Sequence, residues 1–326
     1  MPLAAAAWLR QWSHMLANPS LQERIPLAAG QSFRLLRWQR SVSRVEVVLG
    51  PNRSAPLHGQ GDHWHYHRAT ELTLVQRGAG TRFVADSIEL FDAGDLTLIG
   101  TNVPHYLHQN SGSSGIAIQW EFPLEHGVWS FGETAALRRL LETARRGLQI
   151  SGPTAAATRR QMEELPTLGG LQRLGAFLQI LGRLAEAPAR ELRPLASVPF
   201  SLSGTAAHQE AMRDAVSYIL ASYRETVYLP ELLRLTGMSR ATFSRQFRQH
   251  TGKPFAAFLN QVRLQAVCRA LRDSTDNVGQ IALNHGFNQL SFFNRLFRRE
   301  LGVSPKHYRA GSGRPPDAAA GRHAAT

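Results

Sequence analysis

Two stretches in the last third of the chain, "LLRLTGMSRATFSRQFRQHTG" at residues 232–252 and "IALNHGFNQLSFFNRLFRRELG" at residues 281–302, repeat one pattern. In each stretch an apolar helical segment ends at a glycine, Gly237 or Gly286, and a second segment follows it. Glycine can adopt the left-handed conformation that ends a helix. The repeat therefore predicts two helix pairs, each joined by a turn that is entered through glycine.

The second segment of each repeat carries two phenylalanines four residues apart, Phe243 with Phe247 and Phe293 with Phe297. Residues four apart share one face of a helix, so these pairs mark its buried stripe. Between the repeats, residues 255–273 keep apolar side chains at near-helical spacing and predict one long helix that packs against both pairs. The opposite face of each second helix is then free to meet a partner.

The side chains on those free faces are of the types that read DNA. In a helix-turn-helix the second helix lies in the major groove, and residues near its N-terminal end reach base edges. Arginine bonds guanine, asparagine and glutamine bond adenine, and small apolar groups contact the thymine methyl, whereas arginines farther along contact phosphates. The predicted DNA-contacting residues are Arg240, Ala241, Ser244, Arg245, Arg248, Gln289, Leu290, Ser291, Asn294, Arg295 and Arg298. The alternative is that they are only solvated faces of two helical hairpins.

The charge of the chain favours a polyanionic partner. The formal net charge is +13, and the sequence pI is about 11.1, which is typical of proteins that bind nucleic acid. Residues 205–310 carry 15 Lys and Arg against 7 Asp and Glu, whereas residues 1–204 carry 20 against 16. The positive charge is therefore concentrated where the two helix pairs are predicted.

Length and composition limit the number of domains, the cellular compartment and the presence of membrane segments. A chain of 326 residues is long enough for more than one domain. The single cysteine, Cys268, rules out an internal disulfide and is typical of a reducing compartment, so we expect a cytoplasmic protein with a buried structural thiol. The sequence has no apolar run of 18 residues and no signal-peptide pattern, so we expect no membrane segment.

The residue pattern of the first two thirds of the chain changes twice. Residues 42–122 read as short strands separated by glycine-rich turns, which predicts a β-sandwich or small barrel. Residues 133–187 show helical periodicity, and we expect them to mediate dimerisation. Residues 188–206 have the proline-rich composition of a linker, and residues 311–326 have too few apolar side chains to fold.

Residues of about 209–309 resemble the DNA-binding domain of the AraC/XylS family of transcription regulators. The resemblance rests on "LPELLRLTGMSRATFSRQF", "GKPFAAFLNQVRLQAV" and "VGQIALNHGFNQLSFFNRLFRRELGVSPKHYR". It implies a domain of seven helices, two of which enter consecutive major grooves on one face of the duplex.

The N-terminal part resembles the cupin superfamily. Gly59, His65, His67, Glu71 and Gly78 follow the first cupin motif, and "GDLTLIGTNVPH", which ends at His105, is similar to the second. Regulators of the AraC/XylS family commonly carry a cupin-like sensing domain followed by dimerisation helices, which is the order found here. The predicted α+β multidomain organisation is a cupin-like β-barrel or jelly roll for effector sensing at 1–130, a helical dimerisation segment at 131–187, a linker at 188–206, a double helix-turn-helix domain at 207–310 and a disordered tail at 311–326.

The histidine run is the candidate ligand site. Alternate residues of a strand point to the same face, so His65, His67 and Glu71 are expected to converge, with His105 arriving from another strand. Three imidazoles and a carboxylate suit a divalent metal such as Zn, Fe, Mn or Ni. The alternative is a metal-free pocket in which the same four residues bind an organic ligand directly, so no cofactor is certain.

Together these features predict a sequence-specific DNA-binding transcription regulator controlled by a small-molecule effector. We expect a homodimer, with RNA polymerase as a further partner if the protein is an activator, and no catalytic residues. The alternative is a cupin metalloenzyme, a dioxygenase or an isomerase, with an appended DNA-binding module.

Overall fold

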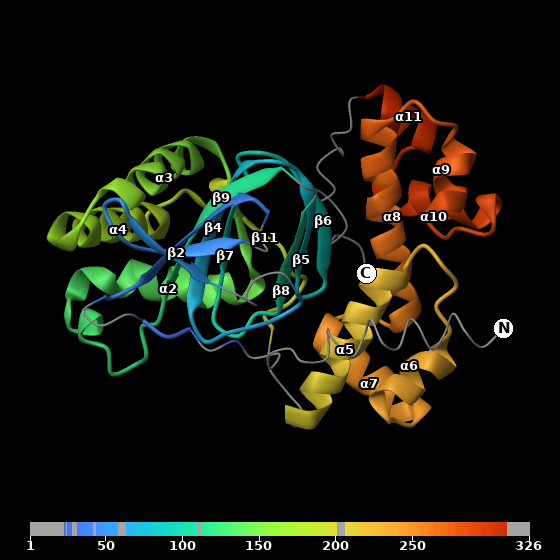
Figure 1. Cartoon of the computed structure of the whole chain (residues 1–326), viewed down its shortest axis with the longest axis horizontal. Helices are drawn as coiled ribbons and strands as arrows, with labels where there is room; N and C mark the ends of the chain where they lie inside the picture. Colours follow the sequence, from blue (N-terminus) through green and yellow to red (C-terminus); the bar gives the residue numbers. More distant parts are fainter. Residues whose placement is uncertain are drawn as a thin grey trace, which may run out of the picture. The chain divides into compact units, whose positions relative to one another are not determined.

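The computed structural model describes residues 23, 25–27, 31–41, 44–57, 63–109, 112–200 and 206–311. It divides into an N-terminal unit, Met1–Ser87 with Phe91–Glu210, and a C-terminal unit, Ile88–Leu90 with Ala211–Thr326 (Figure 1). Gly59 of the first cupin-like motif and residues 312–326 of the predicted tail lie outside the described residues.

The N-terminal unit is built on two antiparallel sheets. Its strands are β1 (Arg34–Arg40), β2 (Val45–Gly50), β3 (Arg53–Leu57), β4 (Thr70–Arg77), β5 (Gly80–Val84), β6 (Ser87–Phe91), β7 (Leu96–Ile99), β8 (His105–Gln109), β9 (Ser113–Trp120), β10 (Leu148–Ile150) and β11 (Leu192–Pro194). One sheet has the order β11-β10-β7-β4-β9-β1-β2-β3 and the other the order β6-β5-β8. The buried Arg82 guanidinium of β5 joins the two sheets, since its Nη1 donates to Thr97 Oγ1 of β7 at 2.9 Å.

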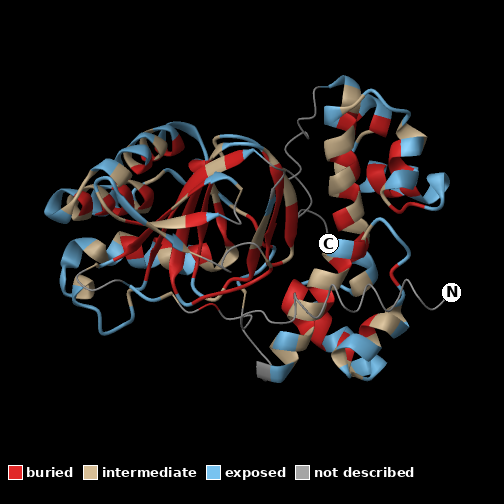
Figure 2. Ribbon diagram, viewed as in Figure 1, coloured by how far each residue is buried: buried red, intermediate tan, exposed pale blue. Residues whose placement is uncertain are grey.

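Strand alternation gives the larger sheet two different faces. On β4, Leu72 and Leu74 belong to the main hydrophobic core, whereas Glu71 and Thr73 line a pocket on the opposite side. Successive side chains of a strand point to opposite faces, so the run "ELTL" supplies both surfaces at once. Figure 2 shows how extensively the strands are buried.

Three helices cover the apolar face of this sheet. They are α2 (Ala135–Thr143), α3 (Gly152–Glu164) and α4 (Gly170–Ala185). Phe177, Ile180 and Leu184 of α4 enter the same core as the strands. The helices predicted at 133–187 therefore form, but they belong to the core of the N-terminal unit.

Two parts of this unit differ from the sequence expectation. The predicted linker 188–206 begins with a 3-10 helix, Ala189–Glu191, followed by β11, which pairs with β10 at the edge of the larger sheet. The run at 81–91, which contains no glycine, is nevertheless split between β5 and β6 by a turn in which Ala85 has φ 48°. Strands of three residues and a left-handed turn without glycine give no clear local signal.

The C-terminal unit is helical. Its helices are α5 (Ala206–Ser222, whose first residues lie in the N-terminal unit), α6 (Leu229–Thr236), α7 (Arg240–Thr251), α8 (Phe255–Asp273), α9 (Val278–Asn284), α10 (Leu290–Leu301) and α11 (Pro305–Ala310). Gly237 ends α6 in the left-handed conformation, and Gly286 after α9 also has positive φ, as the repeat predicts. α8 contacts both α7 and α9.

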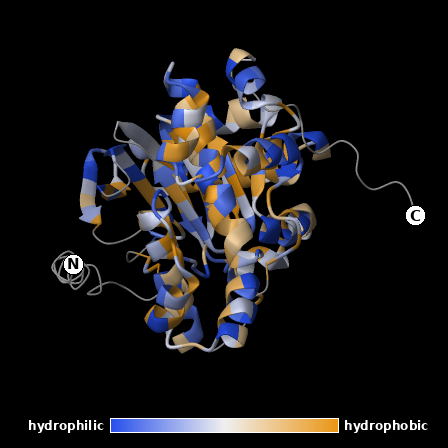
Figure 3. Ribbon diagram, turned by 90° about the vertical axis from the view of Figure 1, so that its right-hand side faces the viewer, coloured by the Kyte–Doolittle hydropathy of each residue, from blue (hydrophilic) through white to orange (hydrophobic). Residues whose placement is uncertain are grey.

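The core of this unit contains the predicted phenylalanine stripes. Phe243, Phe247, Phe293 and Phe297 are all buried, which confirms the helical spacing argument. Cys268 of α8 is buried, and burial raises the pKa of its thiol to about 12, as expected for a structural thiol. None of the described helices is long and apolar enough to cross a membrane, and hydrophilic residues recur along the helices (Figure 3).

Candidate functional site

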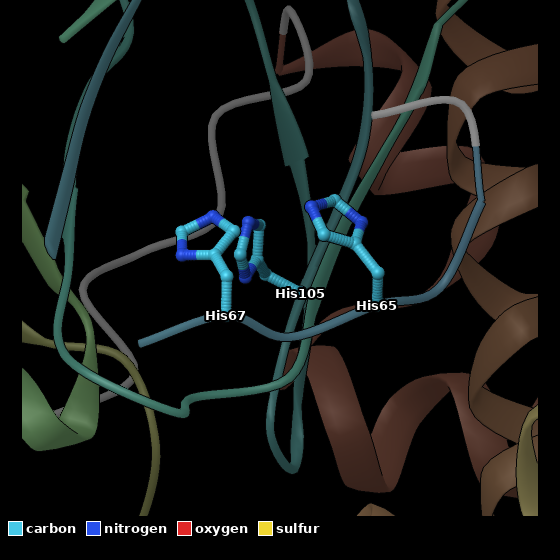
Figure 4. A group of neighbouring side chains, drawn as sticks. All are labelled: His65, His67 and His105. Atoms are coloured by element: carbon cyan, nitrogen blue, oxygen red, sulfur yellow. The ribbon is translucent and has the colours of Figure 1, made fainter. Parts of the chain in front are cut away.

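Three histidines come together at one end of the pocket in the N-terminal unit. His65 lies on the segment before β4 and pairs through its backbone with His105 of β8. The ring of His105 lies between those of His65 and His67, with ring centroids 4.3 and 5.0 Å away (Figure 4). All three residues are buried.

The backbone fixes which ring nitrogens face the cluster. The Nδ1 atoms of His65, His67 and His105 each lie 2.8 Å from a carbonyl oxygen, that of His63, Ala69 and Val103 respectively. A carbonyl only accepts, so each Nδ1 carries the proton and each neutral ring presents a lone pair at Nε2. Nε2 of His105 is buried and has no hydrogen-bond partner within the described residues.

Glu71 of β4 supplies a carboxylate to this cluster. Its Oε2 lies 3.1 Å from Nε2 of His67 and 3.9 Å from Nε2 of His105. Burial alone would raise the pKa of Glu71, but His105 and His67 hold it well below the ordinary value. Burial would lower the pKa of His105, but Glu71 raises it. The space between them therefore favours a positive charge, either a proton or a metal cation.

A chain of buried hydrogen bonds orients Glu71. Gln119 of β9 donates from Nε2 to Glu71 Oε2 at 2.6 Å, and its Oε1 accepts from Arg34 Nε at 2.8 Å. Thr73 donates to the other carboxylate oxygen. Burial lowers the pKa of Arg34, an effect that Glu23 and Glu71 oppose. The sequence analysis did not predict Arg34 and Gln119 as site residues. Which face of β1 and β9 points to the pocket is known only once the pairing of these strands is known.

A second carboxylate, Glu23, lies on the other side of His65. Its Oε2 is 3.8 Å from His65 Nε2, and its Oε1 is 3.7 Å from His63 Nε2. The backbone N–H of Glu23 donates to the carbonyl of Tyr66 at 2.9 Å. The side chain is buried. His63, which precedes the first cupin-like motif, thus contacts this carboxylate, and no pattern in the sequence pointed to Glu23.

The pocket joins this polar cluster to an apolar region. The cavity has a volume of about 60 Å³, and His65, Glu71 and His105 line its polar end. Its apolar lining residues are Leu36, Trp38, Val45, Leu57, Leu107 and Ala117, and Glu23, Arg34, Thr73 and Gln119 complete the polar lining. A space of this size and lining suits a small molecule with one polar and one apolar end.

The three histidines, with Glu71 beside two of them, have the ligand types and spacing that a divalent metal requires. Two atoms bound to one ion at about 2.1 Å are about 3 Å apart at right angles and about 4.2 Å apart when opposite. The distances from Glu71 agree with this geometry, and the ligand nitrogens of His65, His67 and His105 all lie within 4.8 Å of one another. The Nδ1–H bonds to carbonyls are the outer contacts that metal-bound histidines usually make.

The predicted DNA-contacting residues are all exposed in the C-terminal unit. All eleven lie exposed on α7, on α10 or at the N-cap of α10, while the phenylalanines of the same helices face the core. Arg240, Arg245, Arg248, Arg295 and Arg298 make no hydrogen bond or ion pair within the part of the chain that the structure describes. Five guanidinium groups are therefore available to anionic groups of a partner.

Comparisons with known proteins find a matching domain family in the C-terminal unit and relatives that match three quarters of the chain. A family model described as a helix-turn-helix domain matches residues 232–311. The HTH-type transcriptional activator RhaS of Pectobacterium carotovorum is 24% identical over 263 residues, which cover 75% of this chain and 86% of RhaS. An uncharacterized HTH-type transcriptional regulator of Haemophilus influenzae is 34% identical over 104 residues, 32% of this chain and 35% of that protein. ToxT from Vibrio cholerae is a solved structure with 10% identity and a TM-score of 0.32, covering 86% of this chain and 99% of ToxT.

A sheet-rich unit with a pocket, followed by a helical unit that matches a helix-turn-helix domain, defines a DNA-binding transcription regulator. Its relatives across three quarters of the chain are transcriptional activators. These similarities support a transcription regulator of the AraC/XylS type.

Proposed function

We propose that the protein is a ligand-responsive regulator in which the two helix pairs are two helix-turn-helix units that read duplex DNA. The observation that carries this proposal is exposure: every side chain expected to reach DNA is exposed on α7, on α10 or at the N-cap of α10, and the arginines among them have no partner within the described residues. Arg240 and Arg245 lie in the first two turns of α7, where base edges are read. Arg298 lies in the last turn of α10 and suits a phosphate.

The N-terminal unit is, in this proposal, a cupin-like sensing domain. His65, His67, Glu71 and His105 would hold a divalent cation, or would bind the effector directly. A bound cation would supply exchangeable positions for an oxygen or nitrogen atom of the effector. Gln119, which Arg34 holds in place, orients Glu71, and Trp38 and Leu36 line the apolar end of the pocket. Any effector that binds two states of the protein unequally shifts their balance without turnover.

Two further elements of the proposal concern partners. A homodimer would place two DNA-binding units on paired sites and raise the affinity through effective concentration. The relatives named RhaS are activators, so we propose activation with RNA polymerase as the partner. A cupin enzyme with an appended DNA-binding module is not favoured, because the RhaS similarity extends over the N-terminal unit as well.

DNA binding is tested with the full chain and with a fragment that begins near residue 205. Anisotropy of labelled duplexes should show association constants that fall about 100-fold or more between roughly 50 and 200 mM salt, because phosphate contacts release counterions. Selection from a random-sequence library then yields the preferred site. A folded fragment that retains no duplex DNA at any salt concentration contradicts the proposal.

The metal is tested on protein purified without chelators. Elemental analysis should find about one divalent ion per chain, and Glu71→Gln should lower the affinity by roughly 10-fold or more. Gln76→Leu, which removes an exposed hydrogen bond to Glu163, is the control and should bind normally. Protein that carries no metal and takes up none on titration leaves only the direct-binding form of the proposal.

A further inference from the structure

A surface hollow of the N-terminal unit lies between the β2–β3 turn and the start of α4. Its volume is about 650 Å³, and its lining includes Arg53 at the start of β3, Gly169 and Gly170 at the start of α4, and Arg173 in the first turn of α4. None of the described residues that line it is acidic, and none of them lines the pocket beside the histidines. The hollow is therefore a separate, positively charged place on the same unit.

The start of α4 has the features of an anion site. Gly169 is the N-cap residue, and no side chain caps the helix. A Cβ at Gly169 would lie 3.1 Å from Cδ of Pro51, and Gly170 has a φ of +50°, which favours glycine. The first N–H groups of a helix have no partner inside it and carry the positive end of its dipole. Such an end, at a helix of 16 residues, is favourable for an anion.

Arg173 brings a buried guanidinium to the same end of α4. Side chains of a helix lean toward its N-terminus, and here Nε donates to the carbonyl of Leu168 at 2.8 Å and Nη1 to the carbonyl of Val48 at 3.0 Å. Arg173 is 7% exposed and lines the hollow. Its Nη2 is buried without a hydrogen-bond partner, and the side chain makes no ion pair, within the described residues.

A buried guanidinium normally has an anion beside it, because burying an unpaired charge is costly. Burial lowers the pKa of Arg173, which is the effect of desolvation on a cation. The two carbonyls that hold Arg173 are neutral and occupy only two of its three nitrogens. An anion from outside the chain would supply both the missing charge and an acceptor for Nη2.

Two exposed residues add to this arrangement. Arg53 lines the hollow, and its guanidinium makes no hydrogen bond or ion pair within the part of the chain that the structure describes. Leu171 lines the hollow as well and is 81% exposed. A phosphate monoester has three terminal oxygens to accept from helix N–H groups and from two guanidiniums. Its organic part would then lie against the leucine.

We propose that this hollow binds a small organic phosphate, a phosphate monoester whose apolar part rests on Leu171. The helix N-terminus, Arg173 and Arg53 hold the phosphate oxygens. A carboxylate is a poorer fit, because it has two oxygens for the same donors. The N-terminal unit would thus carry a second ligand site, which is distinct from the histidine pocket and does not depend on the proposed function.

NMR of the full chain labelled with [15N]glycine tests the site. Titration with phenyl phosphate should shift the amide resonances of Gly169 and Gly170 saturably, with a dissociation constant of about 1 mM or below. The amide of Gly112, which donates to the carbonyl of Arg40, should stay in place. Resonances at the site are needed because the arginines of α7 and α10 also attract phosphate.

Substitutions of the two arginines test the donors. Arg53→Glu should raise the dissociation constant about 10-fold or more, because it places a carboxylate against the phosphate. Arg77→Glu is the matched control, since Arg77 is an exposed arginine of β4 outside the hollow, and it should bind normally. Arg173→Met should abolish the shifts, with an unchanged Gly112 resonance as evidence of folding. If that variant does not fold, Arg53→Glu still tests the site.

Inorganic phosphate and benzoate separate the two halves of the ligand. Phenyl phosphate should bind roughly 5-fold more tightly than inorganic phosphate through apolar contact, and Leu171→Gln should remove that difference. Equal affinity of the wild-type protein for inorganic and phenyl phosphate overturns the apolar contact. Benzoate that binds as tightly as phenyl phosphate overturns the assignment of a phosphate.

The site itself is overturned if neither glycine resonance shifts with phenyl phosphate, or if Arg53→Glu binds it like the wild-type protein. These outcomes leave the regulator proposal standing, because salt-dependent DNA binding is measured separately. Conversely, a chain that binds phenyl phosphate at Gly169 and Gly170 but retains no DNA would refute only the helix-turn-helix proposal.

Discussion

At the scale of single residues, the buried charges of the pocket are ordered by hydrogen bonds in series. Arg34 bonds Gln119, Gln119 bonds Glu71, and Glu71 contacts His67. A buried charge is tolerated when it is paired and hydrogen-bonded. The series has the Arg34 guanidinium at one end and three imidazoles at the other, so the polar end of the pocket can receive either a cation or a ligand that chelates one.

His250 provides a pH-dependent contribution to the stability of the C-terminal unit. It is buried in the last turn of α7, and burial lowers its pKa from 6.5 to about 4. The folded pKa lies below the unfolded one, so the stabilising contribution is complete above pH 6.5 and is lost as the pH falls toward 4. We expect a loss of about 3 kcal/mol between pH 7 and pH 4 from this residue.

Urea unfolding at several pH values measures this effect. His250→Leu should unfold with a shallower pH dependence between pH 6.5 and 4 than the wild-type protein. His307→Leu changes a histidine on the exposed side of α11 and serves as the control. Identical pH profiles for His250→Leu and the wild-type protein would refute the prediction.

At the scale of elements, the two glycine turns are alike in φ but unlike in their surroundings. Gly237 has open space where a Cβ would lie. At Gly286 a Cβ would come within 2.6 Å of the carbonyl oxygen of Tyr223 and 2.7 Å of Arg263 Nε. Gly286→Ala should therefore cost roughly 3 kcal/mol or more, and Gly237→Ala about 1 kcal/mol from left-handed strain alone. Chemical denaturation measures both, and equal losses would contradict the difference in packing.

Substitutions on α7 and α10 should distinguish residues that set the base preference from residues that set only the affinity for DNA. Arg245→Ala and Arg295→Ala, at the solvent face of α7 and α10, should each cost about 1 to 3 kcal/mol on the selected site and relax the base preference. Arg298→Ala, farther along α10, should weaken selected and scrambled DNA alike, because it is placed for phosphates. Binding to both duplexes is measured by anisotropy. Equal losses on both DNAs for all three variants would show that these faces do not read bases.

At the scale of the whole molecule, the two units should be separable in function. His65→Ala combined with His67→Ala removes two buried lone pairs from the pocket, so the transcriptional response to the effector should be abolished. DNA binding should persist, because the C-terminal unit has its own core. A reporter behind the selected site measures the response, and His126→Ala, at an exposed cap, is the control. A normal response in the double variant would exclude both forms of the pocket proposal.

The sequence by itself determined the features whose physical cause is local. The helix pairs follow from Gly237, Gly286 and phenylalanines four residues apart, because helix termination and helical periodicity act within a few residues. α8 covers the predicted range 255–273. The sequence also nominated His65, His67, Glu71 and, through the resemblance to cupins, His105. Alternation along one strand is the wrong reason for the first three, because only Glu71 lies on β4, and His65 and His67 lie on the irregular segment before that strand. The structure nevertheless places Glu71 beside His67 and His105.

Only the tertiary structure decided which distant residues complete the pocket and which elements close the sheet. Arg34 and Gln119 are 85 positions apart, and nothing near either one shows that they meet beside Glu71. β11 is too short for a periodic signal and is a strand because it pairs with β10 about 40 residues earlier. A contact between distant segments depends on how the whole chain folds, and local spacing carries no information about it.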